Sequence, residues 1–244
     1  MLDHIRPENI LFIDIETVPQ YPGFEQADET VRQLWEKKAA YLIKDTKTPA
    51  EIYQQAGIYA EFGKIVCISA GFLYPQGDKR CFRLRSCFGE DEVALLKDFL
   101  TLVNRFGQQS NIQLCAHNGK EFDFPYISRR MLINGLQLPG ILDIAGKKPW
   151  EVPFIDTMEL WCFGDRKSAT SLKLLTHVFG IPSPKDDIDG SQVATVYWVE
   201  KDLPRIVRYC EKDVVAIAQL LLRYKGLPFL PPESISSSTV FPEV

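Results

Sequence analysis

The chain has 244 residues, of which 45% are hydrophobic and 25% are charged. These proportions exclude a disordered chain, a collagen-like repeat and a coiled-coil rod. Lys and Arg number 28 against 32 Asp and Glu, a formal net charge of −4, which argues against a protein that coats long duplexes by neutralising phosphates. This net charge does not exclude a nucleic-acid enzyme that binds one chain end through bound metal ions.

Targeting signals and cysteine spacing indicate the cellular compartment of a protein. The N-terminal residues lack the basic and apolar regions of a signal peptide, and no apolar run approaches the roughly 20 residues of a membrane helix. The six cysteines are scattered without a metal-finger spacing, and we interpret them as reduced core thiols. We therefore expect a cytoplasmic protein with no membrane contact.

The first half of the chain predicts a central strand, an insertion and a hairpin. Residues 10–15 form a short apolar, β-branched run that is typical of a buried strand. The charged segment 20–63 predicts two helices inserted after this strand. Residues 64–73 and 80–88 predict two strands, and the turn-forming residues at 74–78 predict that they pair as a hairpin.

The second half predicts helices alternating with short strands. We expect helices at 90–106, 124–135, 171–179 and 202–226, and strands at 112–116 and 152–156. This order predicts one α/β domain over residues 1–230, with a mixed central sheet flanked by helices. The Pro- and Ser-rich tail, residues 231–244, is expected to be disordered or an attachment peptide.

Asp14 and Glu16 are the first residues that point to chemistry. Two positions apart on a strand, they face the same side of the sheet, near the strand end where open α/β sheets place their sites. Two carboxylates beside a buried strand lose hydration and repel each other, so they need a compensating cation. The alternative is that Glu16 and Thr17 begin a solvated loop.

Three more residues are candidates for the same site. Tyr209 and Asp213 are four residues apart on the last helix, which stacks them on one face beside its apolar stripe. The alternative for this pair is an ordinary amphipathic boundary with a half-buried tyrosine. Asp123 follows a buried strand and precedes a helix, where an N-cap is its ordinary role.

The four acidic residues Asp14, Glu16, Asp123 and Asp213 could form a single cluster. Such a cluster can hold two divalent ions roughly 3.5–4 Å apart, an arrangement that hydrolyses phosphodiesters. Hard oxygen ligands favour Mg²⁺ or Mn²⁺ over zinc. Each signal is modest alone, and it is their combination and order that are specific.

Three segments resemble the motifs of the DEDD 3′→5′ exonuclease superfamily: residues 14–17, 118–123 and 209–213. They are most similar to the proofreading domain of family B DNA polymerases, whose second motif is N-x-x-x-F-D and whose third is Y-x-x-x-D. The resemblance covers about residues 10–226. It implies an RNase H-like fold.

The third motif indicates the subclass. A histidine variant of the family has His five residues before the final Asp, where this chain has Arg208. Tyr209 stands four residues before Asp213, so the chain resembles the tyrosine subclass. His117 and His177 lie outside the motif positions, and we expect both to be structural.

Two shorter elements also resemble the polymerase domain. Ser171 and Leu172 begin a segment similar to its S/T-L-x-x-hydrophobic element, which contacts single-stranded DNA, and Lys185 begins one similar to its K-x-x-hydrophobic element. Read without the family, Ser171 could equally be a helix N-cap and Lys185 a solvated loop charge.

The resemblance implies a mechanism with two divalent ions, Mg²⁺ or Mn²⁺, held by the four acidic residues. Tyr209 would orient the attacking water, and Lys185 would stabilise charge at the phosphate. The remaining residues implied to bind substrate are Asn118 and Phe122, which would hold the frayed strand, and Thr17, Ser171 and Leu172, which would frame the terminal nucleotide.

We therefore expect a 3′→5′ exonuclease that releases nucleoside 5′-monophosphates from single-stranded DNA, in repair or end trimming. The alternatives are an RNA 3′→5′ exonuclease, a non-catalytic nucleic-acid-binding or scaffolding module, and an RNase H-like endonuclease. Residues 227–244 are too few for a polymerase domain, so we expect a free-standing exonuclease. The sequence identifies no protein partner.

Overall fold

The computed structural model describes residues 2–44, 46–107, 111–165, 169–181 and 188–241. Within them, a mixed six-stranded sheet has the order β5-β4-β1-β2-β3-β6. The strands are β1 (Ile10–Pro19), β2 (Gly63–Gln76), β3 (Lys79–Phe88), β4 (Gln113–Ala116), β5 (Ile155–Asp156) and β6 (Ile235–Ser237). β1 runs parallel to β4 and antiparallel to β2, and β2 and β3 form the predicted hairpin.

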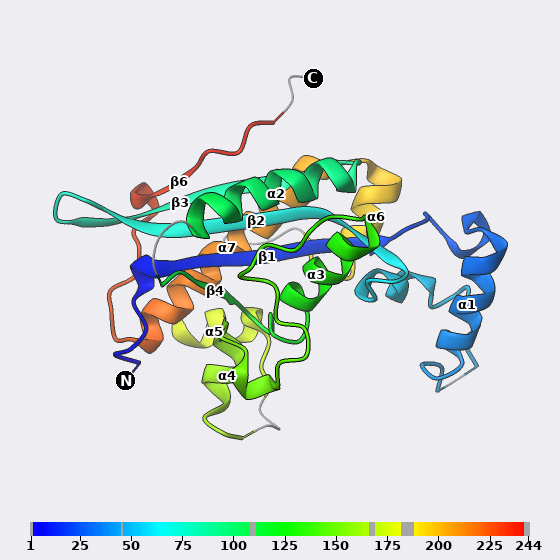
Figure 1. Cartoon of the computed structure of the whole chain (residues 1–244), viewed down its shortest axis with the longest axis horizontal. Coiled ribbons are helices and arrows are strands. Elements are labelled where there is room, and N and C mark those ends of the chain that lie inside the picture. Colours follow the sequence, from blue (N-terminus) through cyan, green and yellow to red (C-terminus); the bar gives the residue numbers. More distant parts are fainter. Residues whose placement is uncertain (1, 45, 108–110, 166–168, 182–187, 242–244) are drawn as a thin grey trace.

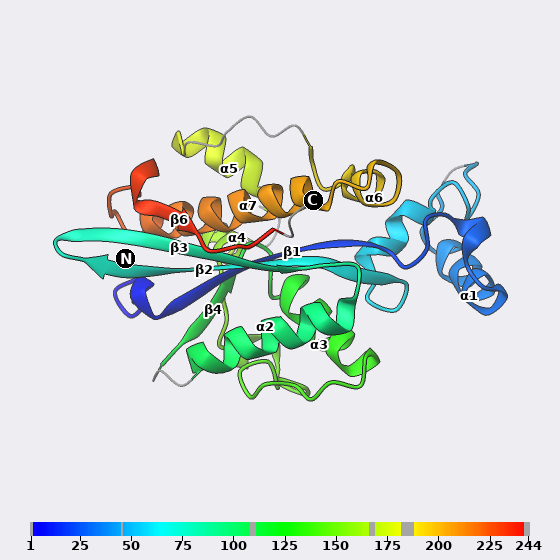
Figure 2. The same ribbon diagram turned by 90° about the horizontal axis from the view of Figure 1, so that it is seen from above.

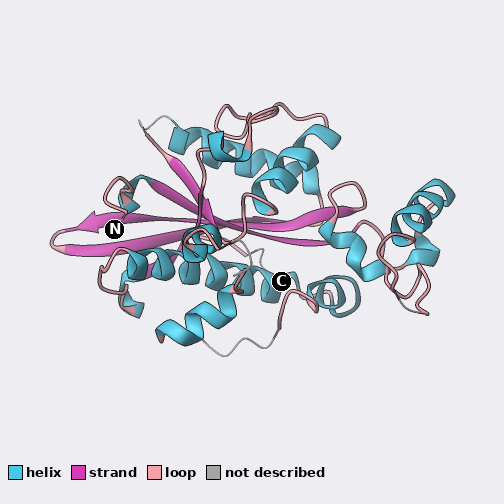
Figure 3. Ribbon diagram, turned by 90° about the horizontal axis from the view of Figure 1, so that it is seen from below, coloured by secondary structure: helices cyan, strands magenta, loops and turns pink. Residues whose placement is uncertain are grey.

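Helices cover both faces of the sheet. Helices α2 and α3 pack on one face, while α7 packs on the other with α5 outside it (Figures 1 and 2). In Figure 3 the strands form a layer between these two groups of helices. The helices are α1 (Glu29–Ala39), α2 (Glu92–Gly107), α3 (Asp123–Ile133), α4 (Thr157–Cys162), α5 (Leu172–Phe179), α6 (Val193–Thr195) and α7 (Leu203–Tyr224).

β1 lies inside the sheet, and its side chains alternate between the two faces. Ile13 and Ile15 enter the core formed with α2 and α3, whereas Phe12 packs with residues of α7. Asp14 and Glu16 have the same parity as Phe12 and therefore face α7. Because β1 continues to residue 19, both carboxylates lie within a strand, and the alternative that Glu16 begins a loop is wrong.

The described residues of the insertion contain one α-helix, where the sequence predicted two. Its centre is Trp35 of α1, which is fully buried among aromatic rings that include Tyr53 and donates from Nε1 to the carbonyl of Pro49 at 2.9 Å. The second predicted helix is a short 3₁₀ helix, Tyr53–Ile58. In Figure 1 the α1 region lies at one end of the sheet, beyond the end of β1.

The C-terminal tail also differs from its predicted disorder. Residues 235–237 form β6, which pairs with the outer edge of β3 in parallel. Glu211 on α7 fixes this strand because its Oε1 accepts hydrogen bonds from the hydroxyls of Ser237, at 2.8 Å, and Thr239. The serine-rich composition that favours disorder in isolation here supplies hydroxyl donors to a carboxylate.

A buried ion pair fastens α3 to the rest of the domain. Arg130 of α3 donates from Nε to Glu92 Oε1 at 2.9 Å, and its Nη1 donates to the carbonyl of Ala60 at 2.8 Å. Glu92 also accepts from the amide of Ile65 at 2.7 Å. Both side chains are less than 10% exposed, at 3% and 8%. The pair therefore sets the position of the helix that begins with Asp123.

The cysteines agree with the expectation of the sequence. All six cysteines are free thiols, and five of them are buried. None of the helices in the described part of the chain combines the length and the apolar composition that a bilayer crossing demands.

Candidate active site

β1 presents Asp14 and Glu16 at the point where its parallel partner ends. The last pair between β1 and β4 joins Phe12 to Cys115, so both carboxylates lie just beyond it. A register shift in the pairing with β2 follows directly, between Glu16 and Thr17. Such bulges bend a strand and re-aim its side chains, and they are common beside active sites.

α7 brings Tyr209 and Asp213 to the same face. The helix begins at the predicted N-cap, Asp202, whose carboxylate accepts from the amide of Arg205 at 3.1 Å. Between the two site residues, Cys210 is fully buried and its thiol donates to the carbonyl of Asp14 at 3.4 Å. This contact holds α7 against β1 next to the carboxylates of Asp14 and Glu16.

Asp123 approaches the cluster from α3, which packs on the face of the sheet opposite α7. It is the first residue of α3 and not its N-cap, a position held by Phe122. Its Oδ1 accepts from the amide of Ile15 at 3.2 Å, which lies past the last β1–β4 pair and would otherwise lack a partner there. The carboxylate therefore replaces β4 along this part of β1.

The four carboxylates lie close enough to disturb one another's ionisation. Burial raises the pKa of Asp14, and the charges of Asp213, Glu16 and Asp123 raise it further. Burial also raises the pKa of Glu16, followed by the charges of Asp213, Cys67 and Asp123. Burial raises the pKa of Asp123 to about 7, although its hydrogen bond from Ile15 opposes the shift. The charge of Asp213 contributes to all three raised pKa values.

The donor set fits a hard divalent cation. The carboxylates of Asp14 and Glu16 and the thiol of Cys210 have ligand atoms within 4.8 Å of one another. Burial raises the pKa of the Cys210 thiol well above its usual value, so it stays protonated and donates to Asp14. The ligands offered are therefore carboxylate oxygens, which suit Mg²⁺ or Mn²⁺.

Tyr209 is held as a neutral phenol. Burial is the largest cause of its strongly raised pKa, followed by the charges of Asp213, Glu16 and Asp14, and it hydrogen-bonds to Asp213. A phenol with such a raised pKa donates this hydrogen bond and does not act as a base near neutral pH. It lies beside the carboxylates, as the spacing on the helix predicts.

The loop between β4 and α3 depends on a residue that the sequence did not single out, Asp156. This buried carboxylate accepts from the amide of Asn118 at 2.9 Å and from that of Lys120 at 3.1 Å. It also caps α4, whose first turn donates to it. Asn118 has a positive φ of 63°, and a side chain at Gly119 would meet the Cβ of Ala116 at 2.3 Å.

Asp156 could have been found from the sequence by one signal. It ends a predicted strand and precedes Thr157, a position that favours an N-cap at the start of a helix. The prediction missed the six-residue helix α4 and, with it, the cap.

The predicted substrate-binding residues fall into two groups. Asn118 and Phe122 lie in the segment that leads into Asp123, and the Oδ1 atom of Asn118 is buried without a hydrogen bond to the described residues. Ser171 caps α5 by accepting from the amide of Leu174 at 3.3 Å, and Leu172 packs beside the α7 core. Lys185 lies outside the described residues.

Two other predicted residues have defined positions. Thr17 is half-buried next to the register shift in β1. His117 is structural, as expected, because its ring bridges Thr157 Oγ1 and the carbonyl of Thr170, each at 2.9 Å. Burial lowers the pKa of His117, which favours the neutral ring with Nε2–H donating to Thr170. This bridge ties the end of β4 to the start of α5.

Comparisons with known proteins agree with this fold. The chain is similar to the family B DNA polymerase from the hyperthermophilic archaeon Pyrobaculum calidifontis, with a TM-score of 0.50 and 17% identity. The likeness covers 88% of this chain and 24% of the polymerase chain, so the protein spans about a quarter of that relative. At this identity the likeness shows the fold, which is the RNase H-like fold of the polymerase exonuclease domain. No curated protein matches significantly.

A protein family gives the more specific result. Its description is a predicted 3′-5′ exonuclease related to the exonuclease domain of PolB, and it matches residues 58–228. The match includes Asp123, Tyr209 and Asp213 and begins after β1. Because it covers more than half of the sequence, the chain belongs to this family of predicted 3′-5′ exonucleases related to the exonuclease domain of PolB.

Proposed function

We propose that the protein is a metal-dependent 3′→5′ exonuclease that removes nucleoside 5′-monophosphates from the 3′ end of single-stranded DNA. The observation that carries the proposal is the convergence of four carboxylates from β1, α3 and α7, in which burial and the charge of Asp213 raise the pKa values of Asp14, Glu16 and Asp123. Clustered carboxylates lose hydration and repel one another when ionised, and bound divalent cations offset both costs.

Asp14, Glu16, Asp123 and Asp213 would hold two Mg²⁺ or Mn²⁺ ions. Such ions supply an activated water and stabilise the charge that develops on the phosphate. Asp14 and Glu16 would be the main ligands, because their carboxylate oxygens already lie close enough to coordinate one ion together.

The chain's own residues would position the reactants. Tyr209, neutral and hydrogen-bonded to Asp213, would hold the attacking water in line with the terminal phosphodiester. The buried Oδ1 of Asn118, which lacks a hydrogen bond within the described residues, would accept one from the substrate. Phe122 would stack against a base, a contact that tolerates any sequence. Lys185 keeps its proposed role beside the scissile phosphate.

DNA is the proposed substrate because the similar solved structure is a DNA polymerase. A 2′-hydroxyl is the group that distinguishes RNA from DNA, so the test includes both substrates.

The test incubates 5′-labelled single-stranded DNA, and RNA of the same sequence, with the protein in Mg²⁺ or Mn²⁺. We expect a metal-dependent ladder that shortens from the 3′ end, faster on DNA. Asp14→Ala should abolish it, whereas Asp78→Asn, in the exposed hairpin turn, should not. Faster cleavage of RNA would reassign the substrate. Binding of both strands without cleavage of either would indicate a non-catalytic module and overturn the proposal.

A further inference from the structure

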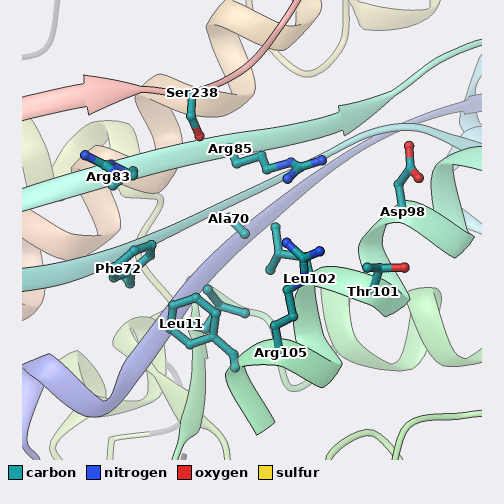
Figure 4. Close-up of a pocket in the computed structure, with 11 residues that line it drawn as sticks. Leu11, Ala70, Phe72, Arg83, Arg85, Asp98, Thr101, Leu102, Arg105 and Ser238 are labelled. Carbon is teal, nitrogen blue, oxygen red and sulfur yellow. The ribbon is translucent and has the colours of Figure 1, made fainter. Parts of the chain in front are cut away.

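The face of the sheet opposite the carboxylate cluster carries a pocket rich in arginine. It has a volume of about 250 Å³ and lies between the β2–β3 hairpin and the C-terminal half of α2 (Figure 4). Arg83 and Arg85 come from β3, and Arg105 comes from α2. In Figure 4, Arg85 and Arg105 extend into the space between these two elements.

The three guanidinium groups form no ion pair with the acidic residues that the structure describes. All three arginines are exposed. One acidic residue, Asp98, lines the pocket. In a chain with a formal net charge of −4, this is a local excess of positive charge.

The hydroxyl groups in the pocket are already engaged. Thr101 donates to the carbonyl of Lys97 at 2.9 Å, and Ser238 donates to that of Leu84 at the same distance. The guanidinium groups are therefore the main side-chain donors left for a ligand, which points to an anion.

Two aromatic rings, Phe72 and Phe106, line the same pocket, and Tyr74 lies beside Phe72. Phe72 packs against Phe106 with ring centroids 4.7 Å apart and lies 6.0 Å from the ring of Tyr74. The guanidinium of Arg83 lies 5.2 Å from the centroid of Tyr74. All three rings are partly exposed. Arginines interleaved with partly exposed aromatic rings are typical of surfaces that bind single-stranded nucleic acid, because phosphates pair with the charges and bases stack on the rings.

The spacing of the arginines fits a chain of phosphates better than a single anion. Arg83 and Arg85 are two residues apart on one strand face, so their Cα atoms lie about 6.6 Å apart. Arg105 adds a third charge from across the pocket. An extended sugar–phosphate backbone can present successive phosphates at a comparable interval.

This pocket is distinct from the proposed catalytic site. Arg85 pairs with Ala70 on β2, and Ala70 pairs with Ile13 on β1. These residues face α2, whereas Asp14, the next residue of β1, faces α7. The sheet therefore separates the two sites.

We propose that the Arg83–Arg85–Arg105 pocket binds the phosphodiester backbone of single-stranded nucleic acid at a stretch of the strand away from its 3′ end. The inference rests on the proposed function, and it adds a second contact that retains a long substrate between cleavage events. A short oligonucleotide that reaches only the carboxylate cluster gains nothing from this pocket.

The test compares two triple variants that each remove three positive charges. The first is Arg83→Gln, Arg85→Gln and Arg105→Gln. The matched control is Lys37→Gln, Lys44→Gln and Arg129→Gln, all exposed and outside the pocket. Binding of a long labelled single strand is measured by fluorescence anisotropy in EDTA at several salt concentrations. Cleavage of a labelled tetranucleotide is measured separately with Mg²⁺.

We expect the pocket variant to bind the long strand more weakly than the control. Its slope of log affinity against log salt should fall by about 2, since each phosphate contact on a single strand contributes about 0.7. Its tetranucleotide cleavage should equal that of the wild type. Equal slopes in the two variants would overturn the proposal, as would loss of tetranucleotide cleavage in the pocket variant.

Two further outcomes separate this proposal from the proposed function. If the tetranucleotide is cleaved but binding of the long strand does not depend on the arginines, the proposed exonuclease activity holds and the proposed role of the pocket is wrong. If binding depends on the arginines but no substrate is cleaved, the proposed role of the pocket holds and the proposed exonuclease activity is wrong. Displacement of the long strand by poly-glutamate as readily as by unlabelled DNA of equal charge would point to an acidic protein ligand and overturn the proposal.

Discussion

The environment of Tyr209 limits what its phenol can do. Burial and the neighbouring carboxylates raise its pKa far above the usual value, so the side chain stays protonated and works as a hydrogen-bond donor. Asp213 receives that hydrogen bond. With its proton donated to Asp213, the phenol oxygen can accept a hydrogen bond from a water molecule and so orient it, but the phenol cannot act as the base. In the proposed mechanism, bound cations would lower the pKa of that water.

Tyr209→Phe should lower the rate of exonuclease cleavage by roughly 10- to 100-fold, at or below the low end of the range for a residue that itself transfers a proton. The fold should tolerate the change, because only one hydroxyl is removed. Tyr224→Phe is a matched control on the same helix, since its buried hydroxyl has no hydrogen bond to the described residues. Equal rates for Tyr209→Phe and the wild type in single-turnover assays would exclude the orienting role.

Residue patterns predicted which side chains lie together in the site, but not all of the contacts that position them. The spacing of Asp14 and Glu16, and of Tyr209 and Asp213, follows from strand and helix geometry, and both pairs lie where that geometry places them. The N-cap position of Asp156 was readable from the sequence, but its second role, which arises from backbone amides of a loop 36 to 38 residues away, was not. A sequence pattern contains no record of such a contact.

At the scale of elements, the buried pair of Arg130 and Glu92 should be the most sensitive anchor of α3. Arg130→Met leaves a buried carboxylate without its cation, and breaking such a pair typically costs about 3–5 kcal/mol. The free energy of unfolding from urea titration should fall by this amount. Arg129→Met, on the exposed side of the same helix, should change it by less than about 0.5 kcal/mol. Similar stabilities for the two variants would mean that the pair contributes little.

Elements with a strong local signal were predicted well, and those made by tertiary contacts were not. α7 has an N-cap, an early proline and a continuous apolar stripe, and its predicted range is nearly correct. β6 has only three residues, and it forms because β3 offers a free edge and Glu211 binds the hydroxyls that follow. The second predicted helix of the insertion begins with capping contacts between Thr48 and Glu51 but continues as a 3₁₀ helix.

For the whole molecule, the carboxylate cluster should make stability depend on pH and on metal together. The pKa of Asp123 is about 7 in the folded protein and about 3.9 in an unfolded chain. A raised folded pKa contributes stability that is complete below the unfolded pKa and is lost as pH rises through the folded pKa. The raised pKa values of Asp14 and Glu16 act in the same direction.

The metal-free protein should therefore lose stability between about pH 4 and pH 7, and Mg²⁺ or Mn²⁺ should restore it by binding the ionised cluster. We expect the rise in Tm on adding metal to be larger at pH 8 than at pH 5.5 by at least a few degrees, since 1 kcal/mol moves Tm by about 2–4 °C in a domain of this size. Asp123→Asn is the matched variant, because an amide oxygen can still accept from Ile15 while the charge is removed. It should raise the metal-free Tm at pH 8 and flatten its pH dependence. A metal-induced rise that is equal at both pH values would show that these acids do not form one cation-binding cluster.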